Sequence, residues 1–159
     1  MVVRRARVIP ATSETLWAVV ADVERLSEWF TFAERAERLG GTGLGRRQRI
    51  HGRWGGRGSE VDQVVTVFEP TRRLAWRHES ERLDGKPAPQ FARETRFSIE
   101  LAPADGGTRV VLTSQQVPAA WWKGVLIWLF GARAFAGQLD RSLARLECLS
   151  VSSGSAPGA

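Results

Sequence analysis

Residues 9–30 read IPATSETLWAVVADVERLSEWF, and they say more about the structure than any other part of the chain. Thr12 is placed to cap a helix, because its hydroxyl can accept a hydrogen bond from an amide of the first turn. Glu14 lies in that turn, where the helix dipole favours an acid. The pattern therefore predicts a helix that begins at Ser13.

Apolar residues recur after this cap at steps of three and four, which is the spacing of one helix face. The residues at these steps are Leu16, Trp17, Val20 and Val23. Asp22 can cap a second short helix, which carries Leu26, Trp29 and Phe30. We therefore expect one strand followed by two short helices that bend around an apolar centre.

The middle of the chain is typical of antiparallel strands separated by turns. Glycines cluster at residues 40–43 and 55–58, and Asp105-Gly106 lies between two alternating runs, which predicts a hairpin. We expect about six strands between residues 33 and 117.

Alternation of side chains assigns the two faces of these strands. The inner face is expected to carry Gln48, Ile50, Trp54, Leu74, Trp76, His78, Phe91, Arg93, Thr95, Phe97, Ser114 and Gln116. In the strand over residues 60–68 either face fits, because the sets that begin at Val61 and at Val64 are both apolar enough. If the second set faces inward, Asp62 enters the interior and can pair with Arg93.

The final element is expected to be one long helix from about residue 119 to 151, introduced by Pro118. Its second half is amphipathic. Its first half is apolar on nearly every side and should therefore be covered. Three covers remain open: the two short helices with the loop at 86–89, a second copy of the chain that contacts Trp121, Trp128 and Phe135, or a lipid surface.

Four pieces of the chain follow one another in a characteristic order. They are the opening with Pro10, Thr12, Trp17, Asp22 and Glu28-Trp29, the turn and strand EPTRRLAW at 69–76, the hairpin GGTRV at 106–110, and the long final helix. In this order they resemble the START-like, Bet v 1-like superfamily, in particular its polyketide cyclase/dehydrase and lipid-transport branch. The resemblance covers about residues 3–150.

The resemblance implies an α+β helix-grip fold. In this fold a curved antiparallel sheet of about seven strands wraps around a long C-terminal helix, with two short helices between the first two strands. It also implies a cavity between the sheet and the long helix.

Composition agrees with one ordinary domain, since the chain has 159 residues and a hydrophobic content of 43%. We expect the domain to span residues 1–151 and the segment SSGSAPGA at 152–159 to be a flexible tail. A single cysteine, Cys148, excludes an internal disulfide, and two histidines make a poor metal site, so no metal or other cofactor is expected. The chain enters a strand directly, without a long apolar leader, which favours a cytoplasmic location.

The formal net charge of +6 raises the question of an anionic partner. Only two of the 23 basic residues are lysines, a skew that genomic base composition alone can produce. A local basic cluster comprises Arg46, Arg47, Arg49, Arg53 and Arg57. It is either a phosphate-binding patch or a solvated outer face of the sheet, and the acids Glu60 and Glu79 on neighbouring strands favour the second interpretation. Nucleic-acid binding is therefore not expected.

The inward set is aromatic with a few polar groups, as in many small-molecule sites. We expect a hydrophobic ligand, aromatic or polycyclic, to bind in an internal cavity, with the protein acting as a carrier, sequestering or accessory protein. The expected contacts are Trp17, Trp29, Trp54, Trp76, Phe91, Thr95, Phe97, Ser114, Gln116 and Trp122.

An enzyme of secondary metabolism is the alternative, a cyclase or dehydratase that needs no metal or nucleotide cofactor. His78 or Asp62 would act as the general base, and Arg93 would stabilise an enolate oxygen. The resemblance implies that aromatase/cyclase members use tyrosine and arginine in the cavity. This chain has no tyrosine, and that departure weighs against polyketide cyclisation.

Overall fold

The computed structural model describes residues 1–90, 92–126 and 131–154. The elements in chain order are β1 (Val2–Ile9), α1 (Ser13–Val20), η1 (Val23–Arg25), α2 (Leu26–Trp29), β2 (Arg35–Gly40), β3 (Arg47–Trp54), β4 (Arg57–Glu69), β5 (Arg73–Leu83), β6 (Lys86–Pro87), β7 (Ala92–Ala104), β8 (Gly107–Pro118), α3 (Trp121–Leu126) and α4 (Ala132–Gly154).

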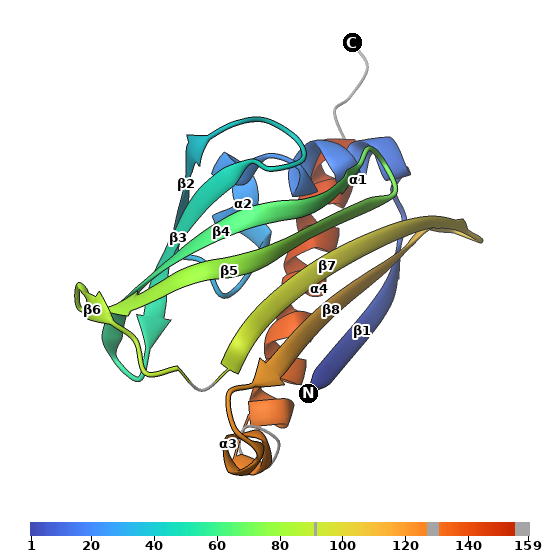
Figure 1. Ribbon diagram of the computed structural model, residues 1–159. Helices are drawn as coiled ribbons and strands as arrows, with labels where there is room; N and C mark the ends of the chain where they lie inside the picture. The colour runs from blue at the N-terminus through green and yellow to red at the C-terminus, as the bar shows by residue number, and fades with distance from the viewer. Residues whose placement is uncertain (91, 127–130, 155–159) are drawn as a thin grey trace.

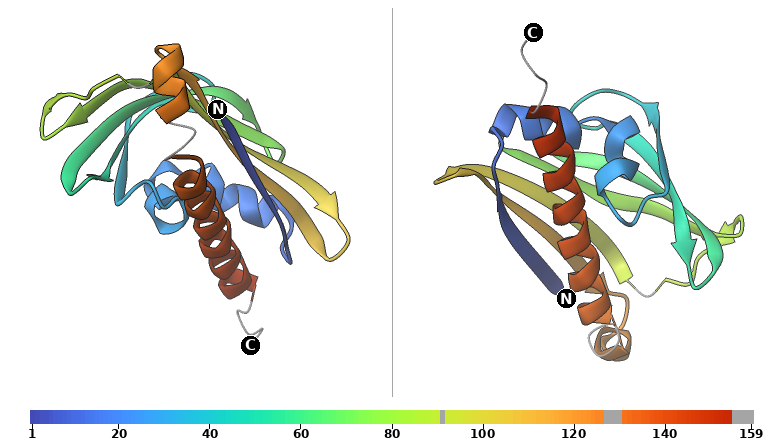
Figure 2. Two further views of the ribbon diagram at one scale, coloured as in Figure 1. Left: turned by 90° about the horizontal axis from the view of Figure 1, so that it is seen from below. Right: turned by 180° about the vertical axis from the view of Figure 1, so that it is seen from behind.

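The strands form one antiparallel sheet in the order β1-β8-β7-β5-β4-β3-β2, and the short β6 pairs with β5. The sheet curves around α4, and α1 and α2 lie on the same side of the sheet as α4 (Figures 1 and 2). α4 contacts β1, β8, α1 and α2. The predicted helix-grip fold is confirmed.

The opening stretch folds as its caps predict. α1 begins at Ser13, and the Thr12 hydroxyl accepts a hydrogen bond from the Thr15 amide at 3.1 Å. Asp22 caps η1 by accepting from the Glu24 amide at 3.0 Å, and η1 leads directly into α2. Trp29 and Phe30 at the end of α2 are fully buried.

The final helix differs from the single element expected. The structure has a short α3 and a longer α4 whose axes do not coincide (Figures 1 and 2). Gly131 directly precedes α4, and glycine weakens a helix through its backbone entropy. Among the described residues, no helix is both long and apolar enough to cross a bilayer.

The last helix extends past residue 151, where the tail was expected to begin. Ser152 and Ser153 belong to α4, and their hydroxyls donate to the carbonyls of Cys148 and Leu149 at 2.8 and 2.9 Å. Residues 155–159 lie outside the described part of the chain.

Strand β4 changes face along its length, which explains why neither alternating set could be preferred from the sequence. Val61, Gln63 and Val65 are buried, but the register with β5 then moves from Val65 opposite Trp76 to Val67 opposite Ala75. Thr66 is the extra residue of this β-bulge. Beyond the bulge Phe68 turns inward and packs on Trp17, with ring centroids 5.3 Å apart.

The hairpin between β7 and β8 is held against the opening stretch at Gly107. Gly107 has φ +145°, and a Cβ added there would lie 2.0 Å from the carbonyl oxygen of Ile9 and 2.8 Å from Pro10 Cα. The neighbouring Gly106 has φ +84° and nothing within 4 Å of the same virtual atom. A comparison of alanine variants at these two glycines therefore separates the cost of the steric contact from the cost of a positive φ.

We expect Gly107→Ala to lower the free energy of unfolding by about 3 kcal/mol, because the backbone of β1 or of the hairpin must move. Gly106→Ala should cost only about 1 kcal/mol, which is the strain of a left-handed alanine. Urea unfolding of the two variants measures the difference. Equal costs would contradict the close approach of the hairpin to Ile9.

Candidate functional site

A row of polar side chains crosses the inner face of the sheet. Gln48 on β3 lies opposite Gln63 on β4, and Gln63 lies opposite His78 on β5. Thr95 on β7 lies opposite Gln116 on β8. Gln48, Gln63, Thr95 and Gln116 are buried, and the side chain of His78 is 14% exposed. These five residues form the polar row.

A buried arginine is anchored to one end of the polar row. Arg46 directly precedes β3 and is 4% exposed. Its Nη1 donates to the carbonyl of Ala21, the C-cap of α1, at 2.6 Å. Its Nε and Nη2 donate to Gln48 Oε1 at 3.2 and 3.0 Å. Burial lowers the pKa of Arg46, and the electronegative C-terminal end of α1 favours its charge.

The hydrogen bonds continue from Gln48 to the next strand. Gln48 Nε2 donates to Gln63 Oε1 at 2.9 Å. Gln63 is fully buried, and its Nε2 has no hydrogen-bond partner in the part of the chain that the structure describes. The Arg46–Gln48–Gln63 relay therefore ends in an unpaired amide nitrogen on the inner face.

His78 is held by a carboxylate through a second β-bulge. The register moves from Asp62 opposite Ser80 to Gln63 opposite His78, so Glu79 is the extra residue on β5. Without this bulge, residues 78 and 81 would face opposite sides of the strand. With it, His78 Nδ1 lies 2.6 Å from Glu81 Oε1.

The protonation of this pair follows from the carboxylate. The hydrogen bond from His78 lowers the pKa of Glu81, which is therefore ionised and can only accept. Nδ1 of His78 must then donate a proton to Glu81, which leaves Nε2 as the ring nitrogen that does not face the carboxylate. Nε2 is buried without a partner among the described residues.

Aromatic rings line the inner face beside the polar row, with Phe97 at their centre. Its ring contacts Phe30 at 5.2 Å, Phe32 at 5.4 Å, Trp76 at 5.9 Å and His78 at 5.8 Å between centroids. Edge-to-face and offset contacts of this kind stabilise an aromatic cluster beyond its burial. The imidazole thus lies at the boundary between the aromatic cluster and the polar row.

Five buried side-chain atoms in the described residues lack hydrogen-bond partners, and all lie in the interior. They are Trp29 Nε1, Gln63 Nε2, Trp76 Nε1, His78 Nε2 and Ser114 Oγ. Each such atom costs about 1–3 kcal/mol when it is left unpaired. All five lie on the inner side of the curved sheet, a region that we call the grip. We take the grip as the candidate site.

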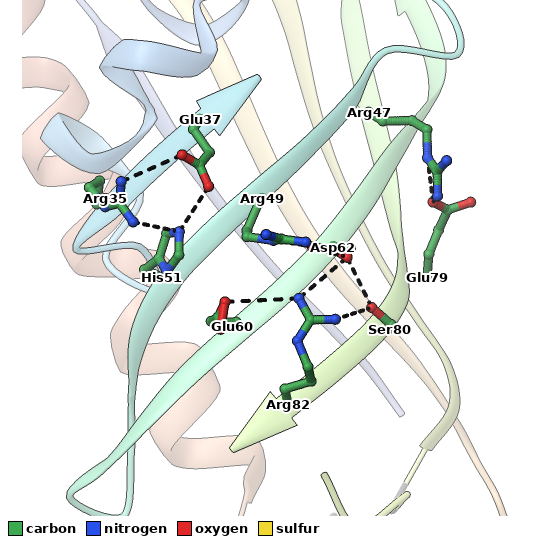
Figure 3. A network of polar contacts seen from close by, with 10 residues as sticks. All are labelled: Arg35, Glu37, Arg47, Arg49, His51, Glu60, Asp62, Glu79, Ser80 and Arg82. Atoms are coloured by element: carbon green, nitrogen blue, oxygen red, sulfur yellow. Dashed lines mark hydrogen bonds and ion pairs between the residues drawn. The ribbon is translucent and has the colours of Figure 1, made fainter. Parts of the chain in front are cut away.

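The outer face of the sheet holds a separate ionic network, and Asp62 belongs to it (Figure 3). Arg49 donates to both carboxylate oxygens of Asp62 at 2.6 and 3.1 Å, and Ser80 and Arg82 approach the same group. The hydrogen bond from Arg49 lowers the pKa of Asp62. Of the two faces left open for this strand, the one that brings Asp62 into the interior is therefore excluded, because the bulge at Thr66 lets Phe68 turn in while Asp62 stays outside.

The outward arginines of the basic cluster are each paired with an acid. Arg47 pairs with Glu79 at 2.8 Å, Arg53 with Glu34 at 3.7 Å, and Arg57 with Asp84 at 2.8 Å. This pairing supports the interpretation of the cluster as a solvated outer face. Arg46 is the exception, since it is buried inside the grip.

Three predicted site residues lie elsewhere, namely Arg93 of the catalytic set and the ligand contacts Trp54 and Trp122. Arg93 is exposed, because the register with β8 moves from Ala92 opposite Pro118 to Glu94 opposite Val117 and leaves Arg93 as the extra residue. Trp54 at the end of β3 and Trp122 on α3 are 53% and 50% exposed. None of these three side chains lies in the buried interior. Phe91 and Trp128 fall outside the described residues.

The other predicted contacts lie inside as expected. Trp29, Trp76, Thr95, Phe97, Ser114 and Gln116 are buried, and Trp17 is half-buried. Sequence reasoning missed Gln63, Glu81 and Arg46 as parts of the site. Gln63 lay on the strand whose face was undecided, and Glu81 faces His78 only because of the bulge. A glutamine within an apolar alternating set was the one available signal for Gln63.

A shallow hollow on the outer face is lined by Thr66, Arg73, Arg96, Ser98 and Thr113, among others. Arg73 and Arg96 have acidic partners in Glu100 and Glu94. The hollow lies on the opposite side of the sheet from the polar row.

The fold agrees with comparisons to known proteins. The profile of the family described as "Polyketide cyclase / dehydrase and lipid transport" matches residues 1–150. The chain belongs to this family. No curated protein matches the sequence significantly.

Solved structures similar to this family member share its fold at low sequence identity. TTHA0849 from Thermus thermophilus is 20% identical with a TM-score of 0.77, over 98% of this chain and 100% of that one. NE0264 from Nitrosomonas europaea is 16% identical with a TM-score of 0.72, over 98% and 97%. Ara h 8.0201 is 13% identical with a TM-score of 0.67, over 96% and 98%. The family match and these neighbours agree on the helix-grip fold, and at this level of identity the neighbours show the fold alone.

The pairing of Asp62 predicts a pH-dependent stability. We expect Asp62→Asn to lower the free energy of unfolding at pH 7 by about 1.5–3 kcal/mol, since it removes a charged, half-buried hydrogen-bond acceptor. Because the folded pKa is lowered, the contribution is present above the ordinary pKa of aspartate and is lost as the pH falls through the folded value. The stabilities of wild type and variant should therefore converge in acid, as urea unfolding at a series of pH values will show.

Asp140→Asn is the matched control, because Asp140 pairs with Arg5 at 3.1 Å in an exposed setting. Exposed pairs contribute little, so this variant should change stability by less than about 1 kcal/mol at every pH. A constant difference between wild type and Asp62→Asn from neutral to acidic pH would contradict the assigned pairing.

Proposed function

We propose that the protein binds a small hydrophobic molecule, aromatic or polycyclic, inside the grip, as a carrier, sequestering or accessory protein. The observation that carries this proposal is the set of five buried, unpartnered polar atoms beside the Phe97 aromatic cluster. An apolar wall with a few convergent polar groups is typical of small-molecule sites. Membership of the family supports the same function.

The location of the site makes Thr95 a suitable position for a blocking variant. Thr95 is 8% exposed on the inner face of β7, and the next residue, Arg96, points outward. We expect Thr95→Phe to weaken binding of 1-tetralone and 9-fluorenone at least about tenfold, because the added ring fills space beside the polar row. Titrations followed by tryptophan fluorescence measure the affinities, and amide NMR spectra verify that the fold is kept.

Arg96→Phe places the same ring on the outer face and should leave the affinities unchanged. If both variants bind as wild type does, or if shift perturbations map to the outer face around Asp62, the proposed site is wrong.

A second function, acid–base catalysis, is favoured by the Glu81–His78 pair. A histidine held by a carboxylate through one nitrogen, with the other nitrogen directed into a buried site, is the arrangement of a general base. Asp62 and Arg93 take no part in this version, because Asp62 lies on the outer face and Arg93 is exposed. The reaction class is proton abstraction next to a carbonyl, as in a cyclase or dehydratase without a metal or nucleotide cofactor.

The proton transfer requires only groups of the chain and solvent. His78 Nε2 takes the proton from the carbon next to the carbonyl, and the C–H electron pair forms the C=C bond of an enolate. The charge moves to the carbonyl oxygen, which buried N–H donors stabilise. In heavy water, return of a deuteron gives exchange at that carbon.

We expect wild-type protein to accelerate hydrogen–deuterium exchange at carbon 2 of 1-tetralone, and His78→Asn to lower that acceleration by about 100-fold or more. NMR integration of the carbon-2 protons measures the rate. His51→Asn is the control, since His51 lies in the outer-face network beside Glu37. Wild-type exchange no faster than buffer would remove this second function and leave binding untouched.

Two further expectations remain predictions. A homodimer through Trp121, Trp128 and Phe135 has partial support, because Trp121 is 82% exposed, while the ring of Phe135 packs on Phe32 at 5.4 Å. Sedimentation equilibrium of wild type and Trp121→Ser tests it. The other two covers, a lipid surface or the two short helices with the loop at 86–89, also stay predictions. A cytoplasmic location is a prediction for cell fractionation.

A further inference from the structure

We infer that the ligand carries a hydrogen-bond acceptor oxygen, such as a ketone carbonyl, and that this oxygen binds Gln63 Nε2 beside His78. Arg46 and Gln48 are positioning residues that fix this preference through the Arg46–Gln48–Gln63 relay. The inference rests on the proposed function and narrows its ligand to one chemical class.

The direction of the relay is set by its arginine. A guanidinium has donors and no acceptor, so Gln48 must present its oxygen to Arg46. Gln48 then has only its NH2 group left for Gln63, which must present Oε1. The nitrogen of Gln63 is thereby left for the interior. Reversing either amide would direct an N–H group at a buried cation or another N–H group, which is strongly unfavourable.

Among the five unpartnered atoms of the described residues, three can act only as donors. Gln63 Nε2, Trp29 Nε1 and Trp76 Nε1 can only donate. Ser114 Oγ can do either, and His78 Nε2 accepts in the neutral ring and donates when protonated. Donors therefore predominate among the unpartnered atoms of the described residues, and a group that pairs with these donors must supply acceptors.

Gln63 and His78 are suited to act on one group of the ligand. They lie opposite each other on β4 and β5, both inside, and Cβ atoms in such a pair are about 5 Å apart. Gln63 is fully buried and its Nε2 has almost no solvent-accessible surface, so only a group that takes up space in the interior can pair with it. An oxygen at Gln63 places the adjoining part of the ligand next to the imidazole and the ring of Phe97.

Matched pairs of small molecules that differ only in the oxygen test the inference. The probes are 1-indanone with indane, 1-tetralone with tetralin, and 9-fluorenone with fluorene. We expect wild-type protein to bind each ketone about two- to tenfold more tightly than its hydrocarbon, after correction for their different water solubility. The infrared carbonyl band of bound 1-tetralone should shift to lower frequency than in hexane.

Two variants of relay residues and one control test whether the preference for ketones depends on the relay. Gln63→Leu removes the donor, and Gln48→Glu keeps an acceptor for Arg46 but cannot donate to Gln63. Both should bring ketone and hydrocarbon affinities together and return the carbonyl band toward its value in hexane. Because the Gln48→Glu carboxylate still pairs with Arg46, this variant should remain folded even if Gln63→Leu does not. Gln115→Leu, on the exposed face of β8, is the control and should keep the preference.

The outcomes separate the inference from the proposed function. Equal binding of ketones and hydrocarbons by wild type, or a preference that survives in both relay variants, overturns the inference and leaves hydrophobic binding intact. Failure of all six probes to bind wild type, with ordered water satisfying Gln63 Nε2 in a crystal structure, overturns the proposed function and the inference together.

Discussion

The pairing register between β4 and β5 is the constraint on which the interior depends. It shifts at Glu79 and again at Thr66, and each shift moves every later side chain of the bulged strand to the other face. The first shift brings Glu81 beside His78. The second keeps Asp62 outside with Arg49 while Phe68 packs inside on Trp17. Strict alternation in both strands would give a different interior from the same residues.

The second determinant is Arg46, a buried cation whose hydrogen bonds go to neutral oxygens. Arg46 is satisfied by the carbonyl of Ala21 at the end of α1 and by the amide oxygen of Gln48. The opening stretch thus does more than cover the sheet, because the C-terminal end of its first helix supplies part of the electrostatic environment of Arg46. Since a guanidinium can only donate, it fixes the orientation of the Gln48 amide. The Gln48 amide in turn fixes the orientation of Gln63, so that Gln63 Nε2 faces the interior. As a result, the interior beneath the curved sheet is apolar but has hydrogen-bond donors along the polar row.

Local rules were sufficient for much of this structure and failed where pairing is non-local. The caps at Thr12 and Asp22 were predictable because capping involves neighbours in the sequence. The inward set of β7 and β8 from Thr95 to Gln116 was predictable because alternation is unbroken there. Arg93 was misplaced at a bulge, and the face of β4 stayed undecided because a bulge depends on the partner strand. The burial of Arg46 was hidden for the same reason, since its acceptor on α1 is 25 residues away in the chain.

In the proposed complex an acceptor oxygen of a small hydrophobic ligand binds in the interior at the end of the Arg46–Gln48–Gln63 relay. A crystal structure of the protein soaked with 1-tetralone tests it most directly. We expect the carbonyl oxygen to lie about 2.7–3.2 Å from Gln63 Nε2, with the rings against Phe97 and Trp76. Ligand density confined to the outer hollow near Arg73 and Arg96, or a carbonyl directed away from Gln63, would contradict it.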